Sequence, residues 1–367
     1  MNQTAGMGII DDASHYKPRR FDGKGHFGKP GKSHHGKGGA RVVDSGLRNA
    51  DIIHGTQQKV LQAFENGKQT LAPDFVLLTY APCSSMIGSD LEENARTIEA
   101  ESGIPAACVN IHGDKDYLYG ISCTLEAMGK LLLRELPTIP GTVNLLGCNA
   151  LDWCKEALAD VEAAINSAGY RVLSRWGMKE STENLKMAAA ASVNWVVNVA
   201  GLRLARYMER EFGIPYIIGA PLGKENCDSL LQAMKDIENK FQTVQNKGTS
   251  PEAVVIGEQL AANAIRSALL QRGFGSVRVL SFLDMDKSCM LPGDCKLSSE
   301  EDLQEQLKLP EIRLVVADPD YAMPAGQNSL WIPLPNTAGM SPVERIENFN
   351  LAGKALDSWL DDKLGKG

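Results

Sequence analysis

Residues 73–88 read PDFVLLTYAPCSSMIG, and this stretch decides how the rest of the chain is interpreted. Residues 75–80 have the apolar character and the length of a buried strand, and a Pro-Cys-Ser-Ser turn follows them. A helix signature with three acidic residues in its first turn comes next. Because ligands of an open α/β sheet bind at the carboxyl ends of its strands, Cys83, Ser84 and Ser85 stand where chemistry is expected.

Strand-like and helix-like segments alternate from residue 42 onward. The expected strands are 75–80, 105–111, 142–146, 170–175, 192–197, 214–218, 253–256, 277–282, 312–317 and 330–334. The expected helices are 56–68, 89–101, 121–136, 152–168, 201–212, 227–245, 259–272, 299–307 and 342–360. Strands that alternate with helices favour right-handed crossovers and parallel sheets. We therefore predict an α/β fold of three Rossmann-like, doubly wound domains.

Turn-rich segments set the expected domain boundaries. The sequence Pro-Thr-Ile-Pro-Gly at 137–141 ends the first domain, and Lys-Gly-Thr-Ser-Pro precedes the third. We assign 42–140 to the first domain, 141–248 to the second and 249–325 to the third. The C-terminal segment 326–367 is expected to pack back onto the first domain.

Residues 1–41 differ in composition from everything after them. They are rich in glycine, lysine and arginine, and they hold four of the six histidines. So few apolar residues cannot offset the entropy lost on ordering, so we expect a flexible, disordered basic arm. A G-x-G-x-x-G match at 23–28 lies inside it, but no strand precedes this match and no helix follows it. A nucleotide site in the arm is therefore disfavoured.

Charge and hydropathy exclude several classes of protein. The chain has 367 residues and a net charge of −7, which argues against non-specific nucleic-acid binding. No apolar run reaches the roughly 18 residues of a membrane helix, and no signal-peptide pattern opens the chain. We expect a cytoplasmic protein with reduced thiols. Its eight cysteines include no C-x-x-C pair, so an iron–sulfur cluster would need distant cysteines or a second subunit.

Three segments carry a family resemblance. LAPDFV at 71–76 leads to Cys83 and then to IGSDL at 87–91, and RYMEREFGIPY occupies 206–216. These segments resemble the nitrogenase component 1 proteins, and weaker similarity runs from about residue 51 to 360. The chain looks like a short, divergent alpha- or beta-type subunit, nearer in size to the tetrapyrrole-reducing relatives.

The resemblance implies a redox function. Cys83 would be a metal ligand of a [4Fe-4S] cluster shared between subunits. Electrons would come from an ATP-dependent, nitrogenase-reductase-like iron protein and reach a substrate bound between domains. The chain would form a homodimer or a heteromer with a related subunit. His112 follows the second expected strand, beside the Cys83 turn in a parallel sheet, and could deliver a proton to the substrate.

Departures from the family pattern keep a second hypothesis open. No cysteine precedes Cys83, so the first cluster ligand of the family is missing. The cysteine that holds the large nitrogenase cofactor would fall near Val197, and the histidine near 331–335, and neither is present. The chain is thus no molybdenum-cofactor-bearing alpha subunit. The alternative is a non-catalytic cofactor- or tetrapyrrole-binding or assembly protein of the same fold, with Cys83 as a small residue in a turn.

The remaining cysteines give weaker signals. Cys108 lies in an expected strand and is interpreted as a buried structural thiol. Cys123 and Cys227 lie near expected helix starts, where the helix dipole lowers a thiol pKa. Cys289 and Cys295 flank an expected loop, where they could form a disulfide, bind a metal or have no function.

Overall fold

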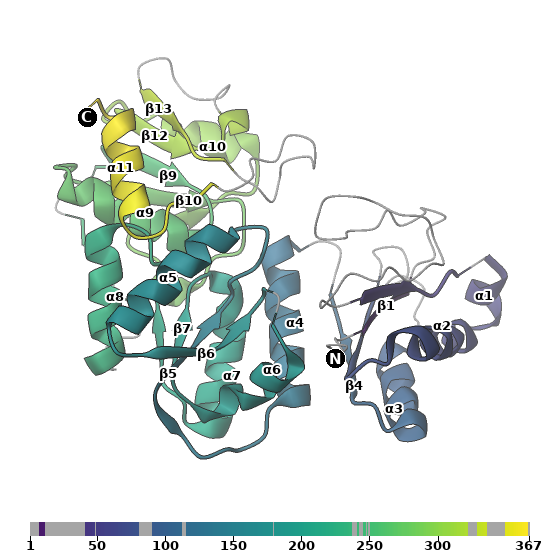
Figure 1. Ribbon diagram of the computed structural model, residues 1–367. Helices are drawn as coiled ribbons and strands as arrows, with labels where there is room; N and C mark the ends of the chain where they lie inside the picture. The colour runs from purple at the N-terminus through teal and green to yellow at the C-terminus, as the bar shows by residue number, and fades with distance from the viewer. Residues whose placement is uncertain are drawn as a thin grey trace. The chain divides into compact units, whose positions relative to one another are not determined.

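The computed structural model describes residues 7–11, 41–47, 49–80, 90–111, 115–178, 180–236, 241, 245–246, 248, 250–321, 329–335 and 349–365. The chain divides into two compact units (Figure 1). Unit 1 comprises Met1–Leu136 with Lys179–Ala189, and unit 2 comprises Pro137–Met178 with Ala190–Gly367. The division between them falls at the start of the Pro-Thr-Ile-Pro-Gly segment.

Unit 1 is built on one sheet with the strand order β2-β1-β3-β4. Its strands are β1 (Met7–Asp11), β2 (Arg41–Asp44), β3 (Val76–Tyr80) and β4 (Ala106–Val109). Its helices are α1 (Asn49–His54), α2 (Gln57–Leu71), α3 (Leu91–Ser102), α4 (Tyr117–Leu132) and α6 (Thr182–Met187). A hydrogen bond of 2.8 Å from Thr182 Oγ1 to Asp74 Oδ2 ties α6 to this unit.

The core of unit 1 lies between its sheet and the α2–α3 pair. Val76 and Leu78 of β3 pack with Phe64 of α2 and with Leu91 and Ile98 of α3, all nearly inaccessible to solvent. α3 begins where the Asp90 side chain accepts a hydrogen bond from the Glu93 amide, and ends at Gly103 in the left-handed conformation. These signals fix the two ends of α3, which starts eleven positions after the last residue of β3.

Strand β1 was not expected from composition. It lies inside the 1–41 stretch that the sequence assigned to a disordered arm, yet its backbone pairs in parallel with both β2 and β3. It is a short Met-Gly-Ile-Ile-Asp run, and the basic, glycine-rich composition of its surroundings conceals it. The rest of that stretch, apart from Arg41, lies outside the described residues.

Unit 2 contains two further sheets. The first has the order β6-β5-β7-β8, with β5 (Ile139–Leu146), β6 (Arg171–Trp176), β7 (Ala191–Val196) and β8 (Tyr216–Ile218). The second has the order β11-β10-β9-β12-β13, with β9 (Ala253–Ile256), β10 (Val277–Ser281), β11 (Cys295–Lys296), β12 (Leu314–Ala317) and β13 (Leu330–Pro333). The helices are α5 (Lys155–Ser167), α7 (Leu202–Phe212), α8 (Lys224–Asp236), α9 (Gln259–Gln271), α10 (Glu300–Leu307) and α11 (Lys354–Lys363). Short 3-10 turns are η2 (Ala188–Ala190), η3 (Val199–Gly201), η4 (Lys287–Cys289) and η5 (Pro319–Tyr321).

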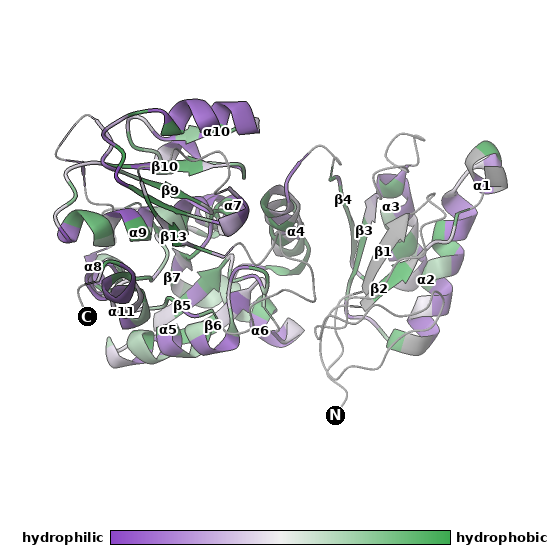
Figure 2. Cartoon of the chain, turned by 90° about the horizontal axis from the view of Figure 1, so that it is seen from above, coloured by the Kyte–Doolittle hydropathy of each residue, from purple (hydrophilic) through white to green (hydrophobic). Residues whose placement is uncertain are grey.

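Helices enclose the β9–β13 sheet on both faces. α10 packs Leu303 and Leu307 against Val254 and Val315 of the sheet, while its outward residues are hydrophilic (Figure 2). α9 contacts β9 and β10, and it is buried along almost its whole length. A helix that is buried all round must find internal partners for its polar side chains, and α9 finds most of them in a loop described below, although Nε and Nη1 of Arg266 make no hydrogen bond to the described residues.

The predicted fold class is confirmed. All pairings between named strands in the three sheets are parallel. In chain order within each sheet, the strands follow a 2-1-3-4 pattern twice and a 3-2-1-4-5 pattern once, as in doubly wound folds. No helix among the described residues is long and apolar enough to cross a membrane.

The described parts of the C-terminal segment belong to unit 2. The expectation that this segment packs onto the first domain stays a prediction. Strand β13 pairs with β12, Arg272 at the end of α9 bonds to Asp357 and Asp361 of α11, and the Lys224 amide donates to Asp357. Complementary charges on Arg272 and on the aspartates of α11 therefore hold α11 in place. A hydropathy pattern does not reveal that α11 pairs with Arg272.

Two expected helix boundaries differ from the structure. Within the described residues α8 reaches Asp236, and further along Phe241 forms an isolated bridge with Ile218 while Asn246 Oδ1 accepts a hydrogen bond from the Val277 amide, so the helix expected to 245 is not continuous to that residue. α11 begins at Lys354, after Gly353 with a φ of 50°, a conformation that favours glycine and interrupts a helix.

Candidate functional site

Each sheet has one point at which the strand order reverses, and ligands of doubly wound folds bind outside the carboxyl ends of the strands at this point. In unit 1 the reversal lies between β1 and β3, and in unit 2 it lies between β5 and β7 and between β9 and β12. These three carboxyl edges are where candidate site residues are to be sought.

The residues of the sequence-predicted site follow two strands of unit 1 in the sequence. Cys83, Ser84 and Ser85 follow β3 directly, and His112 follows β4, the parallel neighbour of β3. All four residues lie outside the described residues, so the structure does not test whether they meet. What it establishes is that the chain enters both segments from the same edge of one parallel sheet.

The described residues beside this edge form an acidic, partly buried environment. The Tyr80 hydroxyl at the end of β3 accepts a hydrogen bond from the Leu91 amide at 3.3 Å, and burial raises the Tyr80 pKa. Burial raises the pKa of Cys108 in β4 to about 11, and the carboxylates of Glu92 and Asp90 add to the shift. Cys108 is thus a neutral thiol at physiological pH, in agreement with a structural role.

A [4Fe-4S] cluster is held by thiolates, and this requirement can be compared with the side chains present. The described residues contain no group of three or more His, Cys, Asp or Glu side chains that could hold a metal ion. The described part of the chain therefore does not form a complete cluster site.

The edge of the first sheet in unit 2 is shaped by close backbone contact. Gly147 follows β5 with a φ of 88°, and a Cβ atom there would lie 2.8 Å from the Asn198 carbonyl oxygen. A Cβ atom on Gly201 would lie 2.6 Å from the Leu146 carbonyl oxygen. Only glycine fits at such distances, so these two residues bring the turns after β5 and β7 together.

Asp152 joins these two turns through its side chain. Its Oδ2 accepts hydrogen bonds from Asn149 Nδ2 at 2.7 Å and from Asn198 Nδ2 at 2.8 Å. The amide oxygen of Asn149 accepts from the Leu151 backbone, and that of Asn198 accepts from the Ala200 backbone. Both amide groups are therefore fixed in orientation, and they present their N–H groups to one carboxylate.

Glu258 follows β9 in the second sheet of unit 2 and links it to the first. Its Oε2 caps α9 by accepting from the Ala261 amide at 2.8 Å. Its Oε1 accepts from the Val199 amide at 2.9 Å, at the start of η3 and α7. The carboxyl edges of the two sheets thus meet at this side chain.

The Glu258 carboxyl is poised to titrate near neutrality. Burial raises its pKa to about 7, and the charge of Asp152 adds to this effect, while the amides of Val199 and Ala261 oppose it. The residue as a whole is intermediate in exposure, while protein atoms enclose the carboxyl group itself. A carboxyl with this pKa can exist in both protonation states under physiological conditions.

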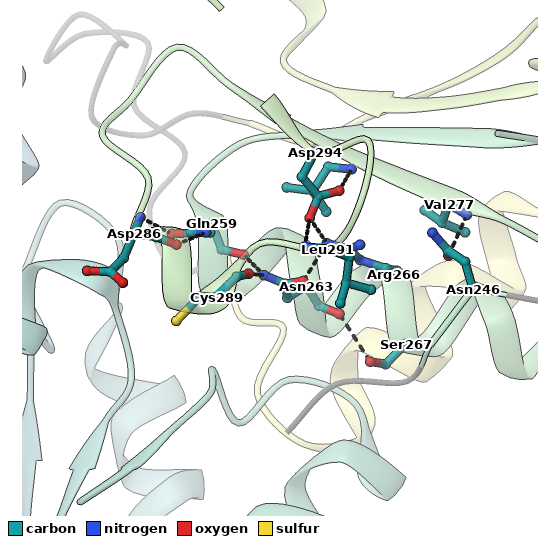
Figure 3. Close-up of polar contacts among 11 residues, drawn as sticks. Asn246, Gln259, Asn263, Arg266, Ser267, Val277, Asp286, Cys289, Leu291 and Asp294 are labelled. Carbon is teal, nitrogen blue, oxygen red and sulfur yellow. Dashed lines mark hydrogen bonds and ion pairs between the residues drawn. The ribbon is translucent and has the colours of Figure 1, made fainter. Parts of the chain in front are cut away.

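A polar face of α9 holds the loop that follows β10 (Figure 3). Gln259 exchanges two hydrogen bonds with the backbone of Asp286, at 2.9 and 2.7 Å. Asn263 donates to the Cys289 carbonyl oxygen, and the fully buried Arg266 donates to Asp294 at 2.6 Å. This loop is therefore fastened to α9 along most of its length.

Asp286 extends this network to α7. It receives two hydrogen bonds from the Arg206 guanidinium, at 2.7 and 2.9 Å. Burial alone would raise the Asp286 pKa, but the hydrogen bonds from Arg206 and Ser288 lower it overall. Helices α7 and α9 are thus connected twice, through Glu258 at their starts and through Asp286 further along α7.

The other cysteines are free thiols where the structure describes them. Cys289 and Cys295 are both free, so the disulfide considered between them does not form. Cys289 is buried in η4, and this burial raises its pKa to about 12. Burial also raises the Cys227 pKa to about 11, which contradicts the lowering expected from a helix start. Desolvation is the larger effect at this position because Cys227 faces the core.

The comparisons with known proteins agree with this architecture. The sequence profile of the family described as Nitrogenase component 1 type Oxidoreductase matches residues 23–288. The chain belongs to this family. The resemblance found in the sequence is thereby confirmed, and the family members are oxidoreductases.

Relatives within the family include one of the subunits of the light-independent protochlorophyllide reductase. The subunit from Angiopteris evecta is 27% identical over 222 residues, covering 55% of this chain and 41% of that protein. Its counterpart from Gloeothece citriformis (strain PCC 7424) is 28% identical over 214 residues, covering 55% and 41%. The matched part thus spans about two fifths of these relatives.

Solved nitrogenase structures share the fold. The structure titled Nitrogenase Cp1 at pH 6.5 superposes with a TM-score of 0.71 at 11% identity, covering 100% of this chain and 89% of that one. A second, Nitrogenase Cp1 at pH 5, gives a TM-score of 0.60 at 15% identity, covering 87% and 77%. At these identities the likeness concerns the fold.

Sequence reasoning missed the polar residues of unit 2. Glu258 follows strand 253–256 after a single glycine and precedes a helix, which is the same strand–turn–helix signal that singled out Cys83. Asp152 and Asn198 also follow strands within a few residues. Arg175 and Trp176 end another strand, but Arg175 pairs with Glu162 of α5 and Trp176 is fully buried. A polar residue just after a strand is therefore a useful sign of a functional site only when the strand lies where the strand order of the sheet reverses.

Proposed function

We propose that this chain is a subunit of a nitrogenase-like reductase that passes electrons through a [4Fe-4S] cluster to a substrate bound between domains. The observation that carries the proposal is that β3, which ends three residues before Cys83 in the sequence, lies at the point where the strand order of the sheet reverses. Membership of an oxidoreductase family supports the same assignment.

The proposal gives each candidate residue a role. Cys83 would be a cluster ligand, with Ser84 and Ser85 beside it in the same turn, and a second subunit would supply further ligands. The cluster would supply one-electron transfer. His112 would hold a proton for the substrate. We further propose a cytoplasmic homodimer or heteromer that receives electrons from an ATP-dependent iron protein.

Metal analysis of two matched variants tests the cluster. Anaerobically purified protein is expected to contain stoichiometric iron and sulfide, with the charge-transfer absorption of a thiolate-bound cluster at about 400 nm. Cys83→Ala should lose both. Cys108→Ala, which changes a half-buried thiol on the neighbouring strand, should retain them. Iron-free wild-type protein, or equal loss in both variants, would contradict cluster binding at Cys83.

A second candidate function rests on a specific observation, the missing cluster ligand set. No cysteine precedes Cys83, and the described residues contain no metal-binding group. We propose as the alternative a non-catalytic cofactor- or tetrapyrrole-binding or assembly protein. Titration of iron-free protein with protoporphyrin IX distinguishes the two: a saturable shift of the porphyrin absorption without cluster formation supports the carrier, and no shift contradicts it.

A further inference from the structure

Glu258 connects the starts of two helices that belong to different sheets. One carboxylate oxygen accepts from the Ala261 amide in the first turn of α9, and the other accepts from the Val199 amide in η3, just before α7. A capping side chain normally serves its own helix alone. Here the same group also fixes the position of a neighbouring helix.

The two hydrogen bonds respond differently to loss of charge. A carboxylate accepts well with both oxygens, whereas a protonated carboxyl retains one good acceptor and gains an O–H donor. The bond to Ala261 lies within the cap of the helix that Glu258 itself begins, so short-range chain geometry maintains it. The hydrogen bond to Val199 depends only on how the β9 sheet and the β7 sheet are placed relative to each other. It is therefore the hydrogen bond that protonation of Glu258 weakens.

The charges around Glu258 favour uptake of a proton near neutrality. Asp152, from the segment before α5, raises its pKa together with burial, to about 7. From η4, the Cys289 thiol is influenced by Glu258, Asp286 and Arg206, and its own raised pKa keeps it neutral. The backbone amides of Val199, Leu260 and Ala261 favour the ionised form. The balance between these groups lies within the physiological range.

The second connection between α7 and α9 does not titrate in this range. Arg206 and Asp286 form a two-bond ion pair, and Gln259 holds the Asp286 backbone on α9. Their hydrogen bonds raise the pKa of Arg206 and lower that of Asp286, so both remain charged near neutrality. The Arg206–Asp286 ion pair therefore stays intact over the pH range in which the Glu258–Val199 hydrogen bond changes.

We propose that Glu258 is a proton-sensitive latch between the two sheets of unit 2. Ionised Glu258 holds the start of α7 against the start of α9. Binding of one solvent proton to its Oε1 weakens the Val199 bond and leaves the Arg206–Asp286 connection in place. The latch lies at the shared carboxyl edge of both sheets, where ligands of such folds bind, so proton uptake loosens the rim of that edge.

Residue-resolved hydrogen exchange and amide chemical shifts of the full-length wild-type protein test the latch. Between pH 8.5 and 5.5, the protection of the Val199 amide, corrected for intrinsic exchange, should fall about tenfold, as expected for loss of one charge-assisted bond. Its shift should titrate with a midpoint near 7. The Val197 amide, which bonds to the Leu146 carbonyl in the sheet, serves as the internal reference.

Two variants give the matched comparison. Glu258→Gln removes the titrating group, so Val199 should be weakly protected at every pH. Glu252→Gln, at an exposed glutamate paired with Arg313, should retain the wild-type pH dependence. Protection of Val199 that does not change with pH in the wild-type protein overturns the proposal, whether or not the variants fold, and so does a pH dependence that survives in Glu258→Gln. The cluster test at Cys83 is independent of either result.

Discussion

The carboxyl edge of β3 and β4 in unit 1 and the carboxyl edge of β5, β7 and β9 in unit 2 arise from the same rule of parallel sheets, but different signals reveal them. The first edge is marked by residue type, because a cysteine and two serines follow a strand. The second is marked by hydrogen bonds, because Asp152 and Glu258 each join two turns. A motif search finds the first kind of edge and overlooks the second.

Similar effects shift the pKa values of an ionisable group near each of the two edges. Cys108 beside the first edge and Glu258 at the second both have raised pKa values, with burial as the largest cause and neighbouring carboxylates as a further one. The thiol becomes inert because its pKa moves away from neutrality to about 11, whereas the carboxyl becomes responsive because its pKa moves toward neutrality, to about 7. Burial and nearby carboxylates therefore keep the Cys108 thiol protonated, whereas they allow the Glu258 carboxyl to titrate near neutral pH.

The largest expected effect comes from disrupting the loop that supports the second edge. Arg266 and Asp294 form an ion pair with side-chain exposures of 0% and 1%. Arg266→Met leaves the buried Asp294 carboxylate without its counter-charge, so we expect the free energy of unfolding to fall by about 3–5 kcal/mol. Urea denaturation measures this change.

Arg313→Met is the control for this prediction, because the Arg313–Glu252 pair is largely exposed and should be worth less than about 1 kcal/mol. A similar, small loss in both variants would show that the loop contributes little to holding the second edge.

The next largest effect comes from separating the turns after β5 and β7. In Gly201→Ala the new Cβ would lie 2.6 Å from backbone atoms of Leu146, so the start of α7 must move. We expect a loss of about 2–3 kcal/mol in urea denaturation. Gly213→Ala is the control: it has a φ of 66° but no atom within 4 Å, so backbone strain alone should cost about 1 kcal/mol. Equal losses would argue against close contact of the two turns.

The sequence predicted most of the fold, because hydropathy periodicity and turn residues act locally. Strand 253–256 and the start of helix 259 agree with the structure to the residue. The misses have non-local causes. Strand β1 depends on pairing with β2 and β3, and α11 depends on Arg272, which lies far away in the sequence.

The two candidate sites also differ in whether local sequence or non-local contacts reveal them. Cys83 could be chosen from the sequence because a thiol after a strand has few other roles, and its assignment stays a prediction. Glu258 carries the same strand–turn–helix signal, but it was not chosen because a glutamate at a helix start is ordinarily a capping residue. Its bond to Val199 and its closeness to Asp152 become visible only once two sheets are assembled.

The pH dependence of stability sharpens the comparison at Glu258. Its pKa is raised from 4.5 to about 7 in the folded protein. The folded state therefore binds a proton more readily than the unfolded chain. Protonation relieves the desolvation cost of the buried charge, so this contribution to global stability is complete below about pH 4.5 and is lost as the pH rises through about 7, even though the single hydrogen bond to Val199 is weaker in the protonated form. Relative to Glu258→Gln, we expect the wild-type protein to lose about 3 kcal/mol between about pH 4.5 and 8. Parallel stability curves for the two proteins would show that Glu258 does not titrate in this range.

The smallest expected effect isolates the contribution of Asp152 to this titration. Asp152→Asn removes a negative charge that raises the Glu258 pKa, yet the new amide oxygen can still accept from Asn149 and Asn198. The midpoint of the Glu258 titration, followed by 13C NMR of labelled glutamate carboxyl groups, should fall by roughly half a pH unit. Asp160→Asn, at a carboxylate that bonds to Asn350 on the exposed side of α5, should leave it unchanged. An unchanged midpoint in Asp152→Asn would mean that burial and the backbone hydrogen bonds set the Glu258 pKa without a contribution from Asp152. The second edge would then respond to a proton through one carboxyl, with Asp152 serving only to hold the turns after β5 and β7 in place.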